Sequence, residues 1–471
     1  MSTECIGSTL DFGQLGSREI VARFDGGEIS SDAGALLLRE VEKRTGIVEK
    51  FARCFRDHRN PQRIEHPLRD LVAQRVYGLA LGYEDLNDHD ALRRDHLLAA
   101  VVGKEDVDGL SRRREEDRGA PMAGKSTLNR LELTRADAGP GERYKKIVIN
   151  PEEVDRMLVE VFLDAHETPP TSIVIDFDET DDPVHGKQEG RFFHGFYREY
   201  CYLPLYAFCG EHLLLARLRQ ANIDASEGTQ EELARIVAHV RARWPQVQIC
   251  IRADSGFCRE RIMSWCEEND VRYVLGLAKN DRLIAMIEPQ RNEAKRTCEA
   301  TGQAARVFAE IEYRTLKTWS GSRRVVAKAE HLPAGANPRF VVTNIPTHQV
   351  DARTLYEVEY CARGEMENRI KEQQLYLYAD RTSTATMRGN QIRLYFSSVA
   401  YVLLCALRRI GLVGTEMEAA QCHTIRTRLL RIGAQVRVTV RKIWISLSSA
   451  YPYQALFALV LERLRPATSV P

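Results

Sequence analysis

Hydrophobic positions recur with two different periods along this chain. Over the first hundred residues they return every three or four positions, most regularly at Pro67–Leu81 and Leu86–Leu98, which predicts a mainly helical region. Between residues 172 and 278, apolar runs of strand length alternate with helical stretches. The pattern therefore predicts a change of fold class along the chain, from helical to mixed.

The middle region has a clear order of expected elements. A strand at 172–178 opens it. The elements expected after that strand are Arg191–Cys209, His212–Arg219, Thr229–Arg243, Val247–Ala253, Arg259–Asn269 and Arg272–Ala278. Three strands, a helix, a strand, a helix and a strand predict a mixed α/β sheet covered by helices.

The rest of the chain divides by the same criteria. Residues 281–350 show strands and turns and predict an all-β insertion, and helices are expected at 353–376 and 397–407. We therefore expect four parts, which are a mainly helical N-terminal domain (1–165), an α/β core (166–280 and 351–410), the all-β insertion (281–350) and a basic C-terminal segment (411–471).

The composition is that of an ordinary soluble protein. Of the 471 residues, 44% are hydrophobic and 28% are charged. The longest apolar run, Val399–Leu407, is shorter than the roughly 20 residues that cross a bilayer, and no secretory signal is visible in MSTECIGSTLDFG at the N-terminus. The eleven cysteines stand singly. We therefore expect a reduced, cytoplasmic protein without a structural zinc site or a membrane partner.

Charge is distributed unevenly along the chain. The net charge of +1 does not by itself predict a nucleic-acid partner. Between Tyr401 and Pro471, however, ten Lys or Arg stand against three Glu, a local charge of about +7. This end of the chain is suited to contact phosphate.

The stretch Ser172–Asp182, SIVIDFDETDD, ends a buried strand with acids. Five carboxylates fall within seven residues, which are Asp176, Asp178, Glu179, Asp181 and Asp182. Because side chains alternate along a strand, Asp176 and Asp178 share one face. Clustered acids repel one another and lose hydration, and a divalent cation offsets that cost. The stretch therefore predicts half of a metal site, with an ordinary acidic turn as the alternative.

Two more acids, far away in the sequence, complete a candidate set. Asp254 follows the strand Val247–Ala253, at the end where ligands gather in α/β sheets. Glu367 lies within the helix expected at 353–376. One face of that helix carries Tyr360, Arg363, Glu367, Lys371 and Gln374 at helical spacing. Together with Asp178, these acids are suited to hold two Mg²⁺ ions that act on a phosphodiester.

Three motifs in this order resemble those of a known family. Asp-x-Thr at Asp178, Ala-Asp-Ser-Gly-Phe around Asp254 and Tyr360-x2-Arg363-x3-Glu367 together resemble the DDE transposases of bacterial insertion sequences. The similarity covers most of residues 172–410 and, more loosely, the helical N-terminal part. It implies an RNase H-like core with an all-β insertion before the third acid.

The resemblance also implies an activity and partners. Such an enzyme cuts the ends of its own element by hydrolysis and joins the freed 3′-OH to target DNA, with two Mg²⁺ or Mn²⁺ ions as cofactors. The partners implied are double-stranded DNA, both as terminal inverted repeats and as target, and a second copy of the chain in a synaptic complex. The helical N-terminal part (1–165) would be a DNA-binding domain that supplies end binding and synaptic contacts together with the basic C-terminal segment (411–471). The protein would be cytoplasmic and associated with the nucleoid when bound to DNA.

The family's metal-binding acids can be carried over by position. Asp178 would be the first acid because it precedes Thr by two residues, with Asp176 as a competitor that strand geometry leaves open. Asp254 would be the second acid and Glu367 the third.

Further contacts to DNA follow from the same resemblance. Tyr360 and Arg363 match the family's phosphate-contacting pair, a role that suits guanidinium chemistry. The family expects Lys seven residues after the third acid, where this chain has Gln374, so Lys371 is the candidate substitute. Trp319, beside Ser320, Gly321 and Ser322, is a candidate to stack on an extruded base or, alternatively, a packing residue.

The sequence leaves two alternative functions open, and one of them is a P-loop nucleotide-binding protein. Gly119, Gly124, Lys125 and Ser126 satisfy the phosphate-loop pattern, but the preceding residues, SRRREEDR, form no buried strand. We therefore interpret Ser126 as the N-cap of a short helix. The other alternative is a domesticated transposase-like protein that binds DNA without cutting it.

Overall fold

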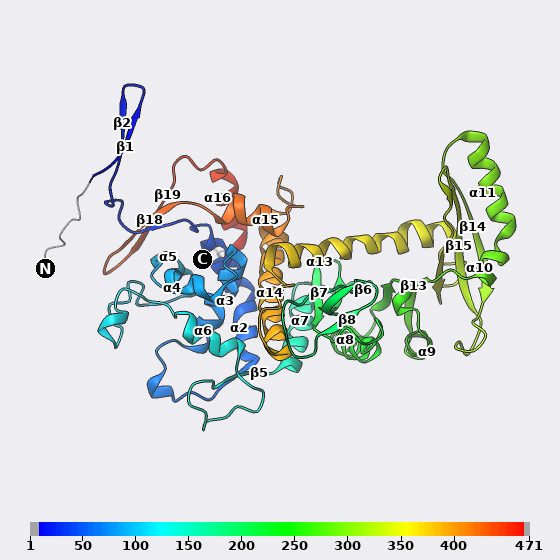
Figure 1. Ribbon diagram of the computed structural model, residues 1–471, viewed down its shortest axis with the longest axis horizontal. Helices are drawn as coiled ribbons and strands as arrows, with labels where there is room; N and C mark the ends of the chain where they lie inside the picture. The colour runs from blue at the N-terminus through cyan, green and yellow to red at the C-terminus, as the bar shows by residue number, and fades with distance from the viewer. Residues whose placement is uncertain (1–8, 466–471) are drawn as a thin grey trace. The chain divides into compact units, whose positions relative to one another are not determined.

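The computed structural model describes residues 9–465. Residues 1–8 lie outside the described residues. They include part of the N-terminal stretch in which we expected no secretory signal. The chain forms two compact units, whose elements are labelled in Figure 1. Unit 1 combines the described residues up to Ile149 with those from Val399 onward, and unit 2 runs from Asn150 to Ser398.

Unit 1 contains short helices and short strands. Its helices are α1 (Ala35–Thr45), α2 (Ile47–Arg53), α3 (Leu68–Leu81), α4 (His89–Leu92), α5 (His96–Val102), α6 (Lys125–Glu132), α15 (Cys422–Ile425) and α16 (Gln454–Leu464). Its strands are β1 (Leu10–Leu15), β2 (Arg18–Ala22), β3 (Ile29–Ser30), β4 (Phe55–Asp57), β5 (Ile147–Ile149), β18 (Ala434–Val438) and β19 (Ile443–Leu447).

The N-terminal and C-terminal parts of the chain meet in unit 1. Strand β18 pairs antiparallel with β3 on one side and with β19 on the other, and Ala434 lies opposite Ser30. The C-terminal segment is therefore built into the helical unit by backbone hydrogen bonds, although the sequence pattern predicted two separate parts.

Helix α3 forms the centre of unit 1. Every residue from Leu71 to Leu81 is buried, since the helix is apolar on nearly every side. Two of its buried polar side chains are hydrogen-bonded: Arg75 Nε donates to Glu132 of α6 at 2.8 Å, and Gln74 donates to the carbonyl of Ala123 at 2.7 Å. These bonds fix α6 against the core.

The start of α6 differs from the expectation. Gly124 occupies the N-cap position, no side chain there caps the helix, and Ser126 lies within the first turn. Asp90 instead accepts the Lys125 N–H at 3.0 Å. The prediction that Ser126 is the N-cap is therefore wrong. The Asp90 carboxylate, from another segment, accepts an N–H at the start of the helix in place of the Ser126 hydroxyl.

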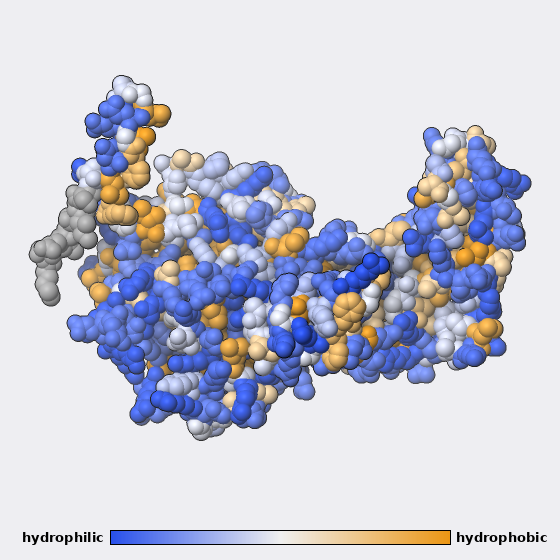
Figure 2. All heavy atoms as spheres, viewed as in Figure 1, coloured by the Kyte–Doolittle hydropathy of each residue, from blue (hydrophilic) through white to orange (hydrophobic). Residues whose placement is uncertain are grey.

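The hairpin of β1 and β2 has no covered face among the described residues. All of its residues are exposed, among them Phe12 and Leu15, and Figure 2 shows hydrophobic side chains along it.

Helix α14 (Met387–Leu407) continues as a wider turn to Leu412. Over Met387–Leu412 it is long and apolar enough to cross a membrane by length and composition, but 83% of its most apolar window is buried inside the protein. Core helices of soluble proteins have the same character, so this helix is weak evidence for a membrane span.

Unit 2 is a mixed α/β unit. Its helices are α7 (Pro151–Asp164), α8 (Thr229–Arg243), α9 (Glu260–Glu268), α10 (Asp281–Met286), α11 (Glu288–Thr301), α12 (Ala352–Thr354) and α13 (Gly364–Leu377). Its strands are β6 (Ser172–Glu179), β7 (Asp182–Pro183), β8 (Phe192–His194), β9 (Glu199–Tyr202), β10 (Leu205–Cys209), β11 (His212–Arg217), β12 (Gln248–Ala253), β13 (Val271–Leu277), β14 (Ala305–Tyr313), β15 (Arg323–Leu332), β16 (Gly335–Ala336) and β17 (Arg339–Thr343).

A nine-stranded sheet organises unit 2 and confirms the predicted mixed sheet. Its order is β11-β10-β6-β12-β13-β17-β15-β14, with β16 beside β15. Strands β6, β12 and β13 are parallel to one another, whereas β10 and β17 are antiparallel to their neighbours in this group. Alternate residues of β6, Ile173, Ile175 and Phe177, enter the core with the buried faces of α7, α8 and α9.

The insertion differs from the all-β prediction in two respects. It begins with α10 and α11, and its strands continue the main sheet because β17 pairs with β13. Helix α11 packs on β14 and β15 (Figure 1). Its apolar face is a narrow stripe, because only Ala294 and Cys298 of the helix are buried. So narrow an apolar stripe gives little helical periodicity, which explains why the sequence pattern missed this helix.

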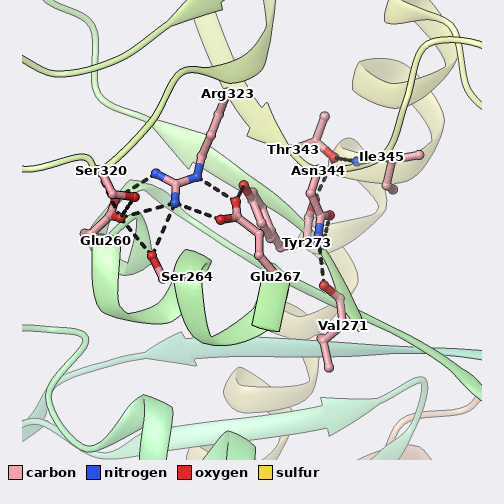
Figure 3. Close-up of polar contacts among 10 residues, drawn as sticks. All are labelled: Glu260, Ser264, Glu267, Val271, Tyr273, Ser320, Arg323, Thr343, Asn344 and Ile345. Carbon is pink, nitrogen blue, oxygen red and sulfur yellow. Dashed lines mark hydrogen bonds and ion pairs between the residues drawn. The ribbon is translucent and has the colours of Figure 1, made fainter. Parts of the chain in front are cut away.

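A buried arginine joins the insertion to the core. Figure 3 shows Arg323 of β15 surrounded by side chains of α9. Its guanidinium donates to Glu267 at 2.6 Å and to Glu260 at 2.7 Å, and only 7% of the residue is exposed. Glu260 also accepts from the Ser320 N–H at 3.1 Å, so the turn before β15 is held by the same group.

Candidate active site: a carboxylate cavity

Asp178 and Asp254 lie at the ends of two neighbouring parallel strands. Phe177 of β6 is paired with Ala253 of β12, so the residues that follow them reach the same edge of the sheet. Asp254 directly follows β12 and accepts the Gly256 N–H at 2.7 Å, which fixes its carboxylate at the start of a short turn. This is the edge at which α/β sheets bind ligands.

Asp176 has a different environment from Asp178, two residues away. Arg252 of β12 donates to both of its oxygens, at 2.5 and 2.8 Å. The same guanidinium donates to the Glu359 carbonyl at 2.5 Å. Burial raises the pKa of Asp176, and the bond to Arg252 opposes that rise. Asp176 is thus a member of a buried ion pair and does not line the cavity that Asp178 lines.

Arg363 bridges two of the three candidate acids. Its guanidinium donates to Asp178 and to Glu367, at 3.0 Å in each case. The side chain of Asp178 is 12% exposed and that of Glu367 is 47% exposed, so the arginine joins a buried carboxylate to an open one. Arg363 immediately precedes α13, and Glu367 follows one turn later.

The helix that carries these residues is not a regular α-helix throughout. It is a π-helix at Leu355–Tyr360 and a 3₁₀-helix at Cys361–Arg363 before α13 begins. The change of pitch alters which residues share a face. Arg363, Glu367, Lys371 and Gln374 line one cavity, as the spacing predicted, but Tyr360 does not.

Tyr360 lies beside Arg363 and against β13. Its hydroxyl comes within 2.6 Å of the point where a Cβ on Gly276 would stand, so a larger residue at position 276 would displace it. Burial raises the pKa of Tyr360, and nearby Arg363 opposes that rise. Glycine at 276 is therefore required for the close approach of this ring to the strand.

The cavity has a volume of about 460 Å³, and more acidic than basic side chains line it. Four carboxylates and two cations line it, which are Asp178, Glu179, Asp254, Glu367, Arg363 and Lys371. Burial raises the pKa of Asp178 to about 7; Arg363 lowers it, and the neighbouring acids raise it. Burial and then Asp254 raise the pKa of Glu179 to about 7 as well. The site therefore holds more negative charge than its own cations neutralise.

Gln374 has a structural contact of its own. Its Nε2 donates to the Asp182 carboxylate at 3.1 Å and to the Asp181 carbonyl at 3.2 Å. Burial raises the pKa of Asp182 well above its usual range. The amide thus supports the buried turn after β6, while exposed Lys371 remains at the cavity wall.

The chain matches the family described as Transposase DDE domain group 1 over residues 12–469. It belongs to this transposase family. The match spans both units and confirms the family that the three motifs suggested.

This chain was also compared with solved structures and with curated proteins. A piggyBac transposase, in a cryo-EM structure of its synaptic complex with hairpin DNA, aligns with a TM-score of 0.41 and 9% identity, over 93% of this chain and 83% of that one. No curated protein matches this transposase-family chain.

Several cavity residues of this transposase were not singled out from the sequence. Glu179 was one acid among five, yet its Oε2 is buried without a partner among the described residues. Phe196 and Tyr197 also line the cavity, and Phe196 is 83% exposed. His194, which the sequence pattern favoured as an ordinary turn or sheet residue, lines it as well. The run of aromatic residues at 192–202 was visible in the sequence as part of a strand, but its place beside the acids depends on the turn between β8 and β9.

Trp319 does not line the cavity of this transposase. It is 8% exposed, its ring meets Tyr313 edge to face at 5.7 Å between centroids, and Arg323 lies 5.4 Å from its centre. The structure supports the packing alternative for this residue, because a base has no access to a ring enclosed in this way.

The donor set fits a divalent cation in its chemistry. Oxygen ligands from carboxylates suit Mg²⁺ or Mn²⁺, and the surplus negative charge and the unpartnered Glu179 oxygen are both features that a cation would satisfy. As the side chains stand, no three acids, histidines or cysteines among residues 9–465 are placed to hold a metal ion. Arg363 lies between Asp178 and Glu367 and supplies positive charge there.

Proposed function

We propose that this chain is the DNA transposase of a bacterial insertion sequence, which cleaves the ends of its element and transfers the 3′-OH ends into target DNA. The observation that carries the proposal is the convergence of Asp178, Asp254, Glu367 and Arg363 in one cavity at the strand ends, in a chain of the DDE transposase family. The reaction class is phosphoryl transfer.

The proposed core is RNase H-like. Support comes from five strands in the order β11-β10-β6-β12-β13, where the first three form an antiparallel meander and the last two run parallel to β6. This arrangement brings the first and second acids to adjacent strand ends and leaves the third to a helix.

Asp178, Asp254 and Glu367 would hold divalent cations in this proposal, and Glu179 is close enough to adjust their charge. A bound Mg²⁺ or Mn²⁺ would supply Lewis-acid stabilisation of the phosphoryl oxygens. The acids of the chain would have to be ionised for this purpose, so Asp178, whose pKa is about 7, would lose its proton in the cation-bound state.

Arg363 and Lys371 would orient the DNA strand. The guanidinium that now bridges Asp178 and Glu367 is the group best suited to a phosphodiester, because it offers two parallel donors. With divalent cations held by the acids, Arg363 would be free to turn its donors to phosphate. Lys371, exposed at the cavity wall, would add a second positive charge.

The proposal includes DNA as partner in two forms, as terminal inverted repeats and as target, and a homodimer, since two ends must be held together. It also places the chain in the cytoplasm. The free thiols of the cysteines that the structure describes support a reducing compartment.

The test is cleavage of a DNA fragment that carries the element ends, in the presence of Mg²⁺ or Mn²⁺. We expect the wild-type chain to cut and Glu367→Gln to retain DNA binding with cleavage reduced by at least about 100-fold. Glu365→Gln is the matched control, because Glu365 lies on the same helix, has a side chain that is 74% exposed and pairs with Arg369 at 3.4 Å. It should cut like the wild type.

Two outcomes would count against the proposal. Equal cleavage by Glu367→Gln and Glu365→Gln would remove Glu367 from the metal-binding acids. Binding without cleavage by the wild type would favour the alternative, a domesticated transposase-like protein that binds DNA but does not cut it.

A further inference from the structure

Unit 1 contains a second charged cavity, and its charge is positive. It has a volume of about 440 Å³ and lies among α4, α6 and the loops around them. Six arginines line it, namely Arg59, Arg63, Arg93, Arg112, Arg114 and Arg130. Three carboxylates line it as well, so the arginines exceed the acids by three. We call this cavity the arginine pocket.

Most of these arginines already have partners in unit 1. The carboxylate partners are Asp57 for Arg59, Asp117 for Arg93, Glu65 for Arg112 and Glu116 for Arg114, at 2.6, 3.2, 2.7 and 3.5 Å. Among residues 9–465, the guanidinium groups of Arg63 and Arg130 have no carboxylate partner. These two side chains therefore supply positive charge that the protein itself does not neutralise.

Arg130 illustrates the electrostatic cost of this arrangement. Burial lowers its pKa, and the nearby charge of Arg59 lowers it further. Two like charges held close together in a partly buried place repel each other, and an anion between them would remove that repulsion. A phosphate oxygen is the anion that guanidinium groups bind best, through paired hydrogen bonds.

The pocket wall gives no place for a nucleobase. Apart from Gly124, every lining residue is charged or carries a hydroxyl or imidazole group. Ligand sites that hold a nucleoside need apolar or aromatic surface against the base, and this wall offers none. The lining is suited to a phosphate group alone.

The glycine motif at 119–126 reaches this pocket but does not form a nucleotide loop. Gly119 follows a 3₁₀ turn at Glu115–Asp117 rather than a strand. The first N–H of α6, that of Lys125, is already taken by Asp90. Ser126 and Thr127 line the pocket, so hydroxyl donors are present, but the charge of the arginines carries the argument.

An exposed aromatic side chain lies beside the pocket. The ring of Tyr144 is 55% exposed, with Arg130 at 5.7 Å and Arg143 at 4.8 Å from its centre. Lys145 and Lys146 follow in the sequence. Basic side chains interleaved with an open aromatic ring are typical of surfaces that follow a nucleic-acid backbone.

We propose that the arginine pocket binds backbone phosphates of DNA through Arg63 and Arg130, at a place in unit 1 that is separate in the fold from the carboxylate cavity of unit 2. This inference rests on the proposed function for the identity of the nucleic acid. It adds a binding site that neither the motifs nor the family match assigns.

The test measures binding of a labelled DNA duplex with the element ends to the full chain, in chelator so that no cleavage occurs, over a series of salt concentrations. We compare the wild type with Arg63→Ala/Arg130→Ala. Loss of two phosphate contacts should weaken binding about 10- to 100-fold at 0.1 M salt and reduce the slope of log affinity against log salt by about two.

The matched control is Arg39→Ala/Arg53→Ala, which removes the same charge from exposed arginines of unit 1 that pair with Glu40 and Glu49. It should keep the wild-type salt slope. Thermal unfolding of each variant shows that it is folded, and Arg63→Lys/Arg130→Lys should restore part of the affinity because it restores the charge.

The outcomes separate this inference from the proposed function. If the wild type binds the duplex and the pocket variant binds with equal affinity and slope, the arginine pocket is not a DNA site, whereas the proposed function stands. A third outcome is that the wild type binds ATP, while Arg63→Ala/Arg130→Ala no longer binds ATP but binds DNA like the wild type. In that case the arginine pocket is a site for a free nucleotide. If the wild type binds no DNA duplex at all, both ideas fail.

Discussion

The carboxylate cavity and the arginine pocket are built in opposite ways. Asp178 and Asp254 of the cavity come from the ends of regular parallel strands, and Glu367 comes from a long helix. The arginines of the pocket come largely from loops and short helical turns between residues 59 and 130. Catalysis at a phosphodiester needs side chains that are held rigidly, whereas electrostatic binding of the DNA backbone tolerates side chains that can change conformation.

The two regions also differ in how their charge is balanced. In the cavity one arginine, Arg363, serves two acids, and in the pocket four of six arginines have acids of their own. The two surpluses have opposite signs, and neither is visible in the total charge of +1, which sums 67 basic and 66 acidic residues. A near-neutral chain can therefore contain two strongly charged sites, and the total charge says little about either.

The sharpest test of this contrast is removal of a cavity acid. We expect Asp178→Asn to lower cleavage of element-end DNA by about 100- to 1,000-fold, because an amide cannot take the place of an ionised metal ligand. DNA affinity, measured in chelator, should stay within a factor of two or three. A large loss of DNA affinity in Asp178→Asn would instead mean that the carboxylate cavity, and not the arginine pocket, contributes most of the DNA binding.

The same substitution should change the pH dependence of stability. The folded pKa of Asp178 is about 7, above its ordinary value of 3.8, so the folded state takes up a proton that the unfolded chain releases. The stabilisation from this group is complete below about pH 4 and is lost as the pH rises to about 7. Asp178→Asn should therefore be more stable than the wild type at pH 8, by roughly 2–4 kcal/mol, and should gain little at pH 4. Urea unfolding at both pH values measures this, and an equal effect at both would contradict the assigned pKa.

Removing the shared counter-ion should have a related, smaller effect. Arg363→Gln leaves Asp178 and Glu367 without their common partner. We expect the unfolding free energy at pH 8 to fall by about 1–3 kcal/mol and Mg²⁺ to restore more of it than in the wild type. Thermal unfolding with and without Mg²⁺ provides the measurement, and Arg369→Gln, on the same helix, is the control. No extra effect of Mg²⁺ would speak against a cation site among these acids.

The smallest effect is expected in the pocket. Arg130→Met removes a charge that Arg59 repels and that no carboxylate pairs with among the described residues, so the variant should be as stable as the wild type or more stable by up to about 1 kcal/mol at low salt. Its DNA affinity should nonetheless fall. Loss of stability together with loss of affinity would indicate that Arg130 has a structural role instead.

The pair of strand-end acids was predictable from the sequence, whereas the rest of the site was less so. Alternation along β6 and the end of β12 point to Asp176 or Asp178 and to Asp254 without any knowledge of tertiary contacts, and the choice of Asp178 came from the family motif. Glu367 required the family motif, because helical spacing alone gives a polar face of no particular function. The separate role of Asp176 depends on Arg252, a residue from another strand that no local pattern connects to it.

Other features depended on contacts between distant segments. The close approach of Tyr360 to β13 depends on Gly276 of a distant strand, and the changes of helix pitch around it have no simple sequence signal. Helix α11 was missed because only Ala294 and Cys298 of its residues are buried. The arginine pocket was missed because its residues come from separate segments, each of which looked like an ordinary charged loop.

The pairing of β17 with β13 makes the insertion an inseparable part of the sheet. If residues 281–343 were deleted, the backbone groups of β13 at Val274–Leu277 that now bond to β17 would become an open edge. Open edges of apolar strands recruit further strands from other molecules. A shortened chain would therefore be prone to aggregate, and truncation is a poor way to ask what the insertion contributes. Point substitutions on its outward surface, which leave every ladder bond in place, would answer that question more directly.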